Sequence, residues 1–132
     1  MLPSLPFKER FTSSRQLLPG GRINSLSDML TSASQIVALA GGGQAGAPVI
    51  NSAYVDLITV ATAADSVALP PATGSGLVIN ITNDGVASAN IFPSGTDVIN
   101  AGGAGAAVAL AAGANAEFVS TKAGFWRRYV SS

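Results

Sequence analysis

The chain has 132 residues with seven basic and seven acidic side chains, and 48% of its residues are hydrophobic while 11% are charged. It contains no histidine and no cysteine, which excludes disulfides, thiolate metal sites and the usual Ser-His or Cys-His catalytic pairs. This length corresponds to one domain. This composition is unusually apolar for the surface of a small monomer, and it predicts that copies of the chain associate and cover part of one another's surface.

The charges are unevenly distributed along the chain. Residues 1–24 carry an excess of basic side chains, residues 25–121 carry only acids, and the last eleven residues carry only bases. Basic ends favour contact with acidic surfaces. The basic side chains of the first segment are too sparse for a dedicated nucleic-acid-binding tail, so a protein partner is favoured.

No membrane association is expected. The N-terminus has no continuous apolar stretch typical of a signal peptide. The longest uncharged stretch, residues 98–116, relies on alanine and contains four glycines, so it is too weakly apolar to insert in a bilayer. These features predict a soluble chain.

Prolines and glycines break any regular period in residues 1–24, which predicts an extended N-terminal arm. Two interpretations remain open for this arm. It either orders along a neighbouring protein through its apolar residues, or it is a solvated terminus, and it meets the compositional criteria for disorder only in part.

The pattern in residues 25–46 predicts one short α-helix followed by a glycine-rich joint. Ser25 is suited to cap a helix over residues 25–40, and Gly41 follows as a stop. Leu26, Met29, Leu30, Ala33, Val37 and Ala40 then form one apolar stripe at helical spacing. Because a helix of this length is marginal alone, the stripe packs either on the remaining domain or against the same helix of other subunits.

Residues 47–132 predict a β domain. Period-two alternation begins at Tyr54, and turn residues then recur at roughly ten-residue intervals. The alternation places on one face Tyr54, Asp56, Ile58 and Val60, and on the other Val55, Leu57 and Thr59. Strands are predicted at 54–60, 66–69, 76–82, 87–92, 97–99, 106–110, 115–120 and 125–130. Asn83, Asp84 and Gly85 are suited to a tight hairpin between 77–82 and 87–92. The fold class predicted is mainly β, an antiparallel β-sandwich or barrel of about eight short strands.

No catalytic, cofactor-binding or metal-binding residues are expected. The acids of the β domain are spread singly at turns and strand ends, where Asp is common, and show neither the pairing of a glycosidase nor the spacing of a calcium loop. The glycine clusters at 41–46 and 102–105 lack the neighbouring residues of a phosphate-binding loop. The sequence therefore predicts a protein that is not an enzyme.

The run Phe125, Trp126, Arg127, Arg128 and Tyr129 is the most suggestive cluster. Arginine stacks on aromatic rings, and such surfaces bind sugars, proteins or single strands, so Trp126, Arg128 and Tyr129 are candidates for a surface contact. The alternative is a last strand that buries Phe125 or Trp126 in the core or between subunits.

Several segments of the β domain resemble small β-modules of tailed-bacteriophage virions. These segments are Asp-Ser-Val-Ala-Leu-Pro-Pro-Ala at 65–72, Leu-Val-Ile-Asn-Ile-Thr-Asn-Asp-Gly at 77–85, Ile-Phe-Pro-Ser-Gly at 91–95, Asp-Val-Ile-Asn at 97–100 and Gly-Phe-Trp at 124–126. Such modules occur in capsid decoration (cement) proteins and in head or tail fibres. The resemblance implies a structural protein without enzymatic activity, usually a trimer.

The resemblance leads to one principal hypothesis and one alternative. The principal one is a homotrimeric capsid decoration protein on the virion surface, which binds and stabilises the shell of major capsid protein. Its expected capsid contacts in the arm are Phe7, Arg10, Phe11, Arg15 and Leu18, and its expected trimer seam along the helix is Leu26, Met29, Leu30, Ala33 and Val37. The alternative is a receptor- or carbohydrate-binding fibre protein that uses Trp126, Arg128 and Tyr129.

Overall fold

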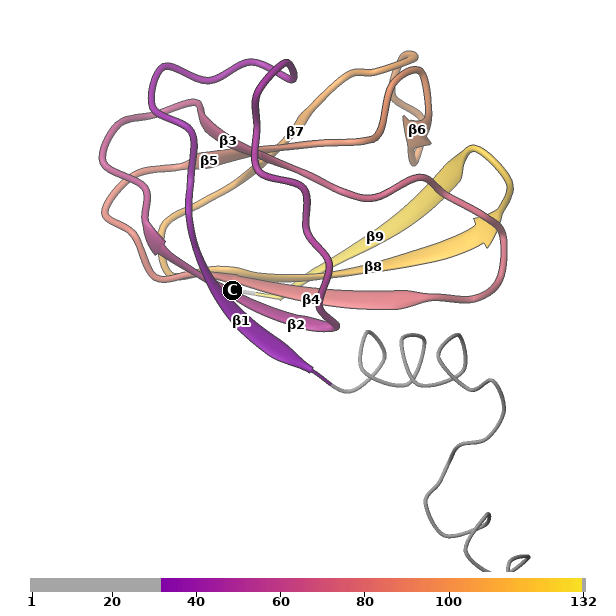
Figure 1. Cartoon of the computed structure of the whole chain (residues 1–132), viewed down its shortest axis with the longest axis horizontal. Coiled ribbons are helices and arrows are strands. Elements are labelled where there is room, and N and C mark those ends of the chain that lie inside the picture. Colours follow the sequence, from indigo (N-terminus) through magenta and orange to yellow (C-terminus); the bar gives the residue numbers. More distant parts are fainter. Residues whose placement is uncertain (1–31, 132) are drawn as a thin grey trace, which may run out of the picture.

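The computed structural model describes residues 32–131, and in this range the chain forms nine β-strands and no helix (Figure 1). The mainly β class is confirmed, and each of the eight predicted strand segments overlaps one strand. The strands are β1 (Ala33–Val37), β2 (Tyr54–Thr59), β3 (Asp65–Ala68), β4 (Val78–Asn83), β5 (Ala89–Phe92), β6 (Val98–Ile99), β7 (Val108–Leu110), β8 (Asn115–Lys122) and β9 (Phe125–Ser131).

The strands form two sheets. The six-stranded sheet has the order β1-β2-β4-β8-β9-β6, and the three-stranded sheet has the order β3-β5-β7. β1, β2 and β4 lie on one side of the domain and β3, β5 and β7 on the other (Figure 1). One apolar core receives residues from both sheets, so it lies between them.

The strand pairing is mixed, and the prediction of an antiparallel arrangement is wrong for this part of the fold. β1 pairs with β2, β2 with β4, and β3 with β5, all in parallel. Parallel neighbours need a crossover connection. Here the crossover from β2 to β4 contributes a strand, β3, to the opposite sheet, so the chain winds around the core in the manner of a β-solenoid. Antiparallel pairing appears later, where β8 pairs with β4 and β9, and β7 with β5.

The predicted hairpin between 77–82 and 87–92 is also wrong, because β4 and β5 belong to different sheets. The turn between them carries the chain across the domain. Neither Asn83, Asp84 nor Gly85 has a positive φ. Gly85 is required for a different reason, since a Cβ atom there would lie 2.5 Å from the Cβ of Val60.

Asn83 joins the two sheets at this turn. Its side chain is fully buried, and its Nδ2 group donates to the carbonyls of Ala87 at 2.8 Å and of Leu110 in β7 at 2.9 Å. Its Oδ1 atom accepts from the N–H of Gly85 at 2.9 Å. The buried amide therefore pairs three backbone groups and links the turn after β4 to β7.

The predicted helix is wrong for residues 33–37, which form β1. The segment also carries a period of two, because Ser34 and Ile36 turn inward while Ala33, Gln35 and Val37 are exposed. Pairing with β2 and the β-branched residues Ile36 and Val37 outweigh the helical spacing of the apolar stripe. Residues 25–31 lie outside the described range. β structure thus begins at Ala33, before the boundary predicted near residue 47.

The core is built on the alternation that the sequence predicts for β2. Tyr54, Asp56 and Ile58 are exposed, whereas Val55 and Leu57 are buried. Val60, predicted on the same face as Tyr54, Asp56 and Ile58, is instead buried beyond the end of the strand. The largest buried side chains are Trp126 and Phe118 of the hairpin β8-β9, and most of the others are Ile, Leu and Val.

We predict that Asn83→Ala lowers the free energy of unfolding by about 2–4 kcal/mol, because it leaves the carbonyls of Ala87 and Leu110 and the N–H of Gly85 without this partner. Chemical denaturation measures the difference. Asn80→Ala, in the same strand but half-buried and directed outward, is the matched control, with an expected change within about 0.5 kcal/mol. Equal losses in the two variants would contradict the role given to Asn83.

Candidate functional site

The outer face of the six-stranded sheet carries a row of side chains that crosses four strands. Tyr54 of β2 pairs with Asn80 of β4, Asn80 pairs with Glu117 of β8, and Glu117 pairs with Tyr129 of β9. The next outward row contains Asp56, Thr82 and Asn115. Because all four strands are in register, these side chains lie next to one another on a single surface.

A groove of about 420 Å³ follows this surface, and we call it the outer-face groove. It is lined by Tyr54, Asn80, Ile81, Thr82, Asn115, Ala116, Glu117, Tyr129 and Val130. Tyr54 is 56% exposed and Tyr129 is 54% exposed, and they stand three strand spacings apart, about 14–15 Å. Two exposed rings therefore bound a floor made of amide, hydroxyl and carboxylate groups.

The chemistry of the groove favours binding of an extended polar chain. Tyrosine rings stack on apolar or planar groups and attract cations, while the carboxylate of Glu117 and the amides of Asn80 and Asn115 can form hydrogen bonds with a ligand. Thr82 Oγ1 donates to Asn115 Oδ1 at 2.7 Å, which fixes part of the floor. The exposed carboxylates of Asp56 and Glu117 make this part of the face acidic.

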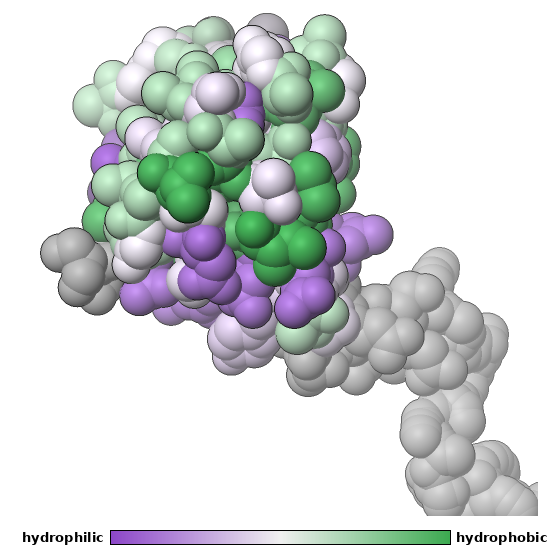
Figure 2. Space-filling view, turned by 90° about the vertical axis from the view of Figure 1, so that its left-hand side faces the viewer, coloured by the Kyte–Doolittle hydropathy of each residue, from purple (hydrophilic) through white to green (hydrophobic). Residues whose placement is uncertain are grey.

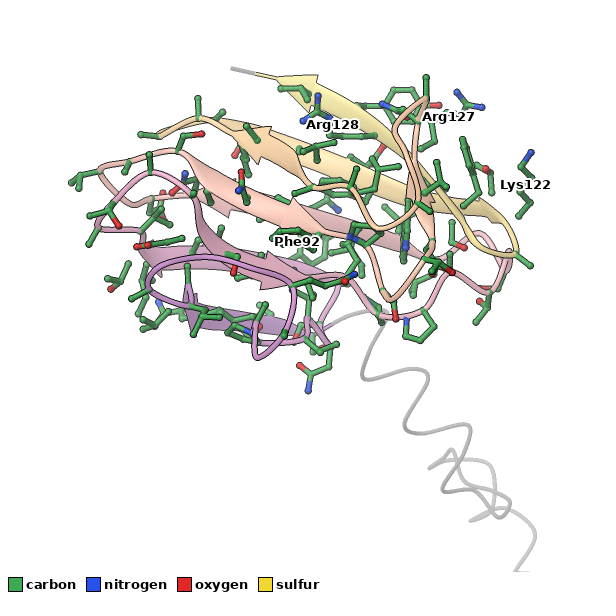
Figure 3. All side chains as sticks on the ribbon, turned by 90° about the horizontal axis from the view of Figure 1, so that it is seen from above. Phe92, Lys122, Arg127 and Arg128 are labelled. Carbon is green, nitrogen blue, oxygen red and sulfur yellow. The ribbon has the colours of Figure 1, made fainter. Side chains whose placement is uncertain are left out.

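The opposite end of the same face is basic. Lys122 Nζ lies 4.9 Å from the centre of the Phe125 ring, and the guanidinium carbon of Arg127 lies 5.4 Å from it. Lys122 and Arg127 project at one end of the molecule, whereas Arg128 lies farther along β9 (Figure 3). The outer face thus changes from basic at Phe125 to acidic at the row of Tyr54 and Glu117.

The surface contact predicted for Trp126, Arg128 and Tyr129 is wrong for Trp126, which is 0% exposed. β9 alternates, so Trp126 turns into the core while Arg127 and Tyr129 turn outward, as in the alternative that the sequence left open. Arg128 is half-buried; its Nη1 group donates to the carbonyl of Ala109 at 2.9 Å, and its N–H donates to Asn100 Oδ1 at 2.9 Å. The Arg128 side chain therefore links β9 to β7. Of the three predicted contact residues, Tyr129 is the one that is exposed.

The other predicted contact residues are mostly outside the described range. This holds for the arm residues Phe7, Arg10, Phe11, Arg15 and Leu18 and for Leu26, Met29 and Leu30 of the seam. Ala33 and Val37 are exposed on β1, and Val37 is 55% exposed, but they belong to a strand. A helical seam that includes them is therefore wrong.

The chain passes from β2 to β3 and from β4 to β5 at one end of the domain (Figure 1). Ile58, at the end of β2, is exposed there. Val86, between β4 and β5, is 85% exposed. Figure 2 shows strongly apolar residues at this end, bordered by a hydrophilic band on the side of the six-stranded sheet. The outer face is thus more polar than the end of the domain next to it.

Asp65 has a structural role. It is buried at the start of β3, and its carboxylate accepts from the Thr62 hydroxyl at 2.8 Å and from the N–H groups of Ala61, Thr62 and Gly41 at 3.0–3.2 Å. The hydrogen bonds from Thr62, and then those from Gly41 and Ala61, lower the pKa of Asp65 below 3.8, against the opposing effect of burial. The carboxylate holds the turn before β3 against the loop after β1.

Within residues 32–131, no group of three acidic, histidine or cysteine side chains is placed to hold a metal ion. The same part of the chain contains no helix long and apolar enough to cross a membrane. No protein-family model, no curated protein and no solved structure matches the chain.

Sequence reasoning did not single out Tyr54, Asn80 or Glu117. The alternation along β2 and β8 places Tyr54 and Glu117 on the outward faces of their strands. Their proximity depends on which strands are neighbours and in what register, and this information is not local in the sequence.

We predict that Asp65→Asn lowers the melting temperature at neutral pH, because an amide cannot accept all four hydrogen bonds. The pKa of Asp65 is lower in the folded protein than its ordinary 3.8, so the carboxylate stabilises fully above that pH. The advantage of the unmodified chain shrinks as the pH falls through the folded-state pKa.

Thermal unfolding followed by circular dichroism from about pH 7 to about pH 2 measures this difference. Asp84→Asn, at an exposed acid in the turn after β4, is the control and is expected to change the melting temperature little. A difference between Asp65→Asn and the unmodified chain that stays constant with pH would contradict the assignment.

Proposed function

We propose that the chain is a structural protein of a tailed-phage virion: a capsid decoration protein that binds the shell of major capsid protein as a homotrimer and stabilises it without catalysing a reaction. The observation that supports this most is the outer face of the six-stranded sheet. Its inner side is committed to the core, while its outer side presents exposed tyrosines and aliphatic side chains around a groove. Exposed aromatic residues in such a setting are typical of protein interfaces.

The fold suits a decorating role because its binding surface rests on a rigid base. The groove lies on four hydrogen-bonded strands whose inner residues, such as Leu57, Ile79 and Phe118, are fully buried. A sheet face of this kind changes little on binding, so affinity is not lost to ordering of the surface. Repetition of the contact around a trimer and over a symmetric shell then multiplies modest affinities.

In this proposal the N-terminal arm, residues 1–24, is a second contact with the capsid shell. Residues 1–24 combine Phe7, Phe11 and Leu18 with Arg10 and Arg15, a composition suited to lie along an acidic and apolar protein surface. The arm adds contact area that the compact domain lacks. Exposed Val86 and Val37 offer further apolar surface for contact between subunits.

We predict that deletion of residues 1–24 abolishes binding to the shell while the domain stays folded, because the deletion removes none of the described strands. Co-sedimentation with empty heads of the phage that encodes the chain measures binding, and circular dichroism reports the fold. Sedimentation equilibrium of the full chain should give three times the chain mass of 13.1 kDa. Undiminished binding of the shortened chain would remove the arm from the proposal.

The second candidate is a carbohydrate-binding protein of a head or tail fibre, and one observation favours it. Tyr54 and Tyr129 flank Asn80 and Glu117, and sugar rings stack on tyrosine while their hydroxyls bond to amides and carboxylates.

If this candidate holds, glycan-array binding should be lost in Tyr129→Ala, since the variant removes one of the two exposed rings. Lys122→Ala, at the other end of the same face, should retain binding. If the unmodified chain binds no glycan on the array, the fibre alternative is rejected.

A further inference from the structure

The two sheets of the described domain have four edge strands, and the chain itself covers three of them. At β3, Leu39 and Val49 form bridges to the strand. At β7, the Nη1 group of Arg128 donates to an outer carbonyl, and beside β6 the N–H of Gly102 donates to the carbonyl of Ile99 at 3.0 Å. Backbone groups that a neighbouring strand could pair with are therefore already occupied at these edges.

β1 is the fourth edge, and within residues 32–131 it pairs with β2 alone. It is the outermost strand on its side of the six-stranded sheet (Figure 1). Ser32 accepts a hydrogen bond from β2 and Ala38 donates one to β2, both at 3.1 Å, so the even-numbered residues face β2. The residues whose N–H and C=O groups point away from β2 are Ala33, Gln35 and Val37.

β1 lacks the features by which edge strands avoid pairing. Its sequence, Ala-Ser-Gln-Ile-Val, contains no proline and no charged residue. The register shift after Ile36 places the extra residue in β2 and leaves β1 regular. Ile36 faces the core but is only half-buried, whereas Leu57, opposite it in β2, is 0% exposed. The sheet is thus incompletely packed along β1.

A second copy of β1 fits this edge. In an antiparallel pair with a two-fold axis at Gln35, this residue lies opposite the partner's Gln35, and Ala33 lies opposite the partner's Val37. All three outward-facing residues then exchange both backbone hydrogen bonds with the residue opposite.

The charge distribution permits this pairing. A two-fold contact brings each side chain near its own copy, so a charged strand would repel itself, whereas β1 is uncharged. The amide of Gln35 can donate to and accept from a second amide. Asp56, next to Gln35 on β2, would lie about 14–15 Å from its copy, farther than the Debye length of about 8 Å at physiological salt.

We propose that β1 is a docking edge for β1 of a second copy, so that the six-stranded sheets of two molecules join into one continuous sheet. Paired strands of five residues bury far less than the roughly 1,200 Å² of a stable interface, so the contact is transient in dilute solution. A two-fold contact cannot close a ring of three. It is therefore additional to the proposed trimer and would join neighbouring trimers, where repetition strengthens weak contacts.

Disulfide cross-linking of the purified full chain tests the docking edge, since the chain has no cysteine of its own. Gln35→Cys should form a covalent dimer under mild oxidation, because Cα atoms of an opposed, hydrogen-bonded pair lie about 5.5 Å apart, within reach of a disulfide. Ala101→Cys is the matched control, exposed beside β6 at the other edge of the same sheet. Gln35→Cys should cross-link about tenfold faster than this control, because docking holds its thiols together.

Ala33→Cys and Val37→Cys test the register. Alone, each variant keeps its thiol about 13–14 Å from its copy, four residues along the strand. A mixture of the two should cross-link faster than either variant alone, and circular dichroism checks that all variants are folded.

Equal rates for Gln35→Cys and Ala101→Cys would overturn the proposal, and they are also the result expected if anything else covers this edge. Cross-linking of Ala33→Cys alone at the rate of the mixture would overturn the antiparallel pairing about Gln35. The experiment uses no shells, so its failure is distinguishable from failure of the decoration role.

Discussion

A single core between two sheets constrains every other feature of this domain. Side chains alternate along a strand, so the strands that bury Val55, Ile81 and Phe118 must direct their other residues outward. Parallel winding keeps β1, β2 and β4 in register, and the hairpin of β8 and β9 continues that register. The outward residues consequently form rows, and the row from Tyr54 to Tyr129 is a result of this packing.

The crossing of the chain between the sheets explains the buried polar residues. A segment that leaves one sheet for the other has backbone groups without ladder partners, and burying them unpaired is costly. Asn83 satisfies them after β4, Asp65 before β3, and Asp97 accepts from the N–H of Ala72 at 2.8 Å. Because several core residues are alanine, whose side chains bury little apolar area each, these polar links add to the specificity of the fold.

The sequence predicts features that depend on neighbouring residues, such as strand positions, and it misses features that depend on contacts between distant segments. Alternation and turn residues located the eight strands from Tyr54 onward, because period and turn chemistry act over a few residues. Residues 33–37 carry two periods at once, and only their pairing with β2 decides between them. The parallel pairing and the groove depend on contacts between distant segments, for which the sequence of one chain carries no direct signal. The inward direction of Trp126 was among the open alternatives, and the register of β9 with β8 decides it.

The polarity of the outer face limits what can cover it. Its acidic end holds Glu117 beside two exposed tyrosines, and its basic end holds Lys122 and Arg127 around Phe125. A ligand of uniform charge, such as the phosphate backbone of a nucleic acid, would be attracted at one end and repelled at the other. A polypeptide can place basic and acidic side chains at separate positions along its length, and aromatic residues between them. For the proposed function, the face would therefore suit a protein segment of mixed charge, and the order of charges along that segment would set the direction in which it lies across the strands.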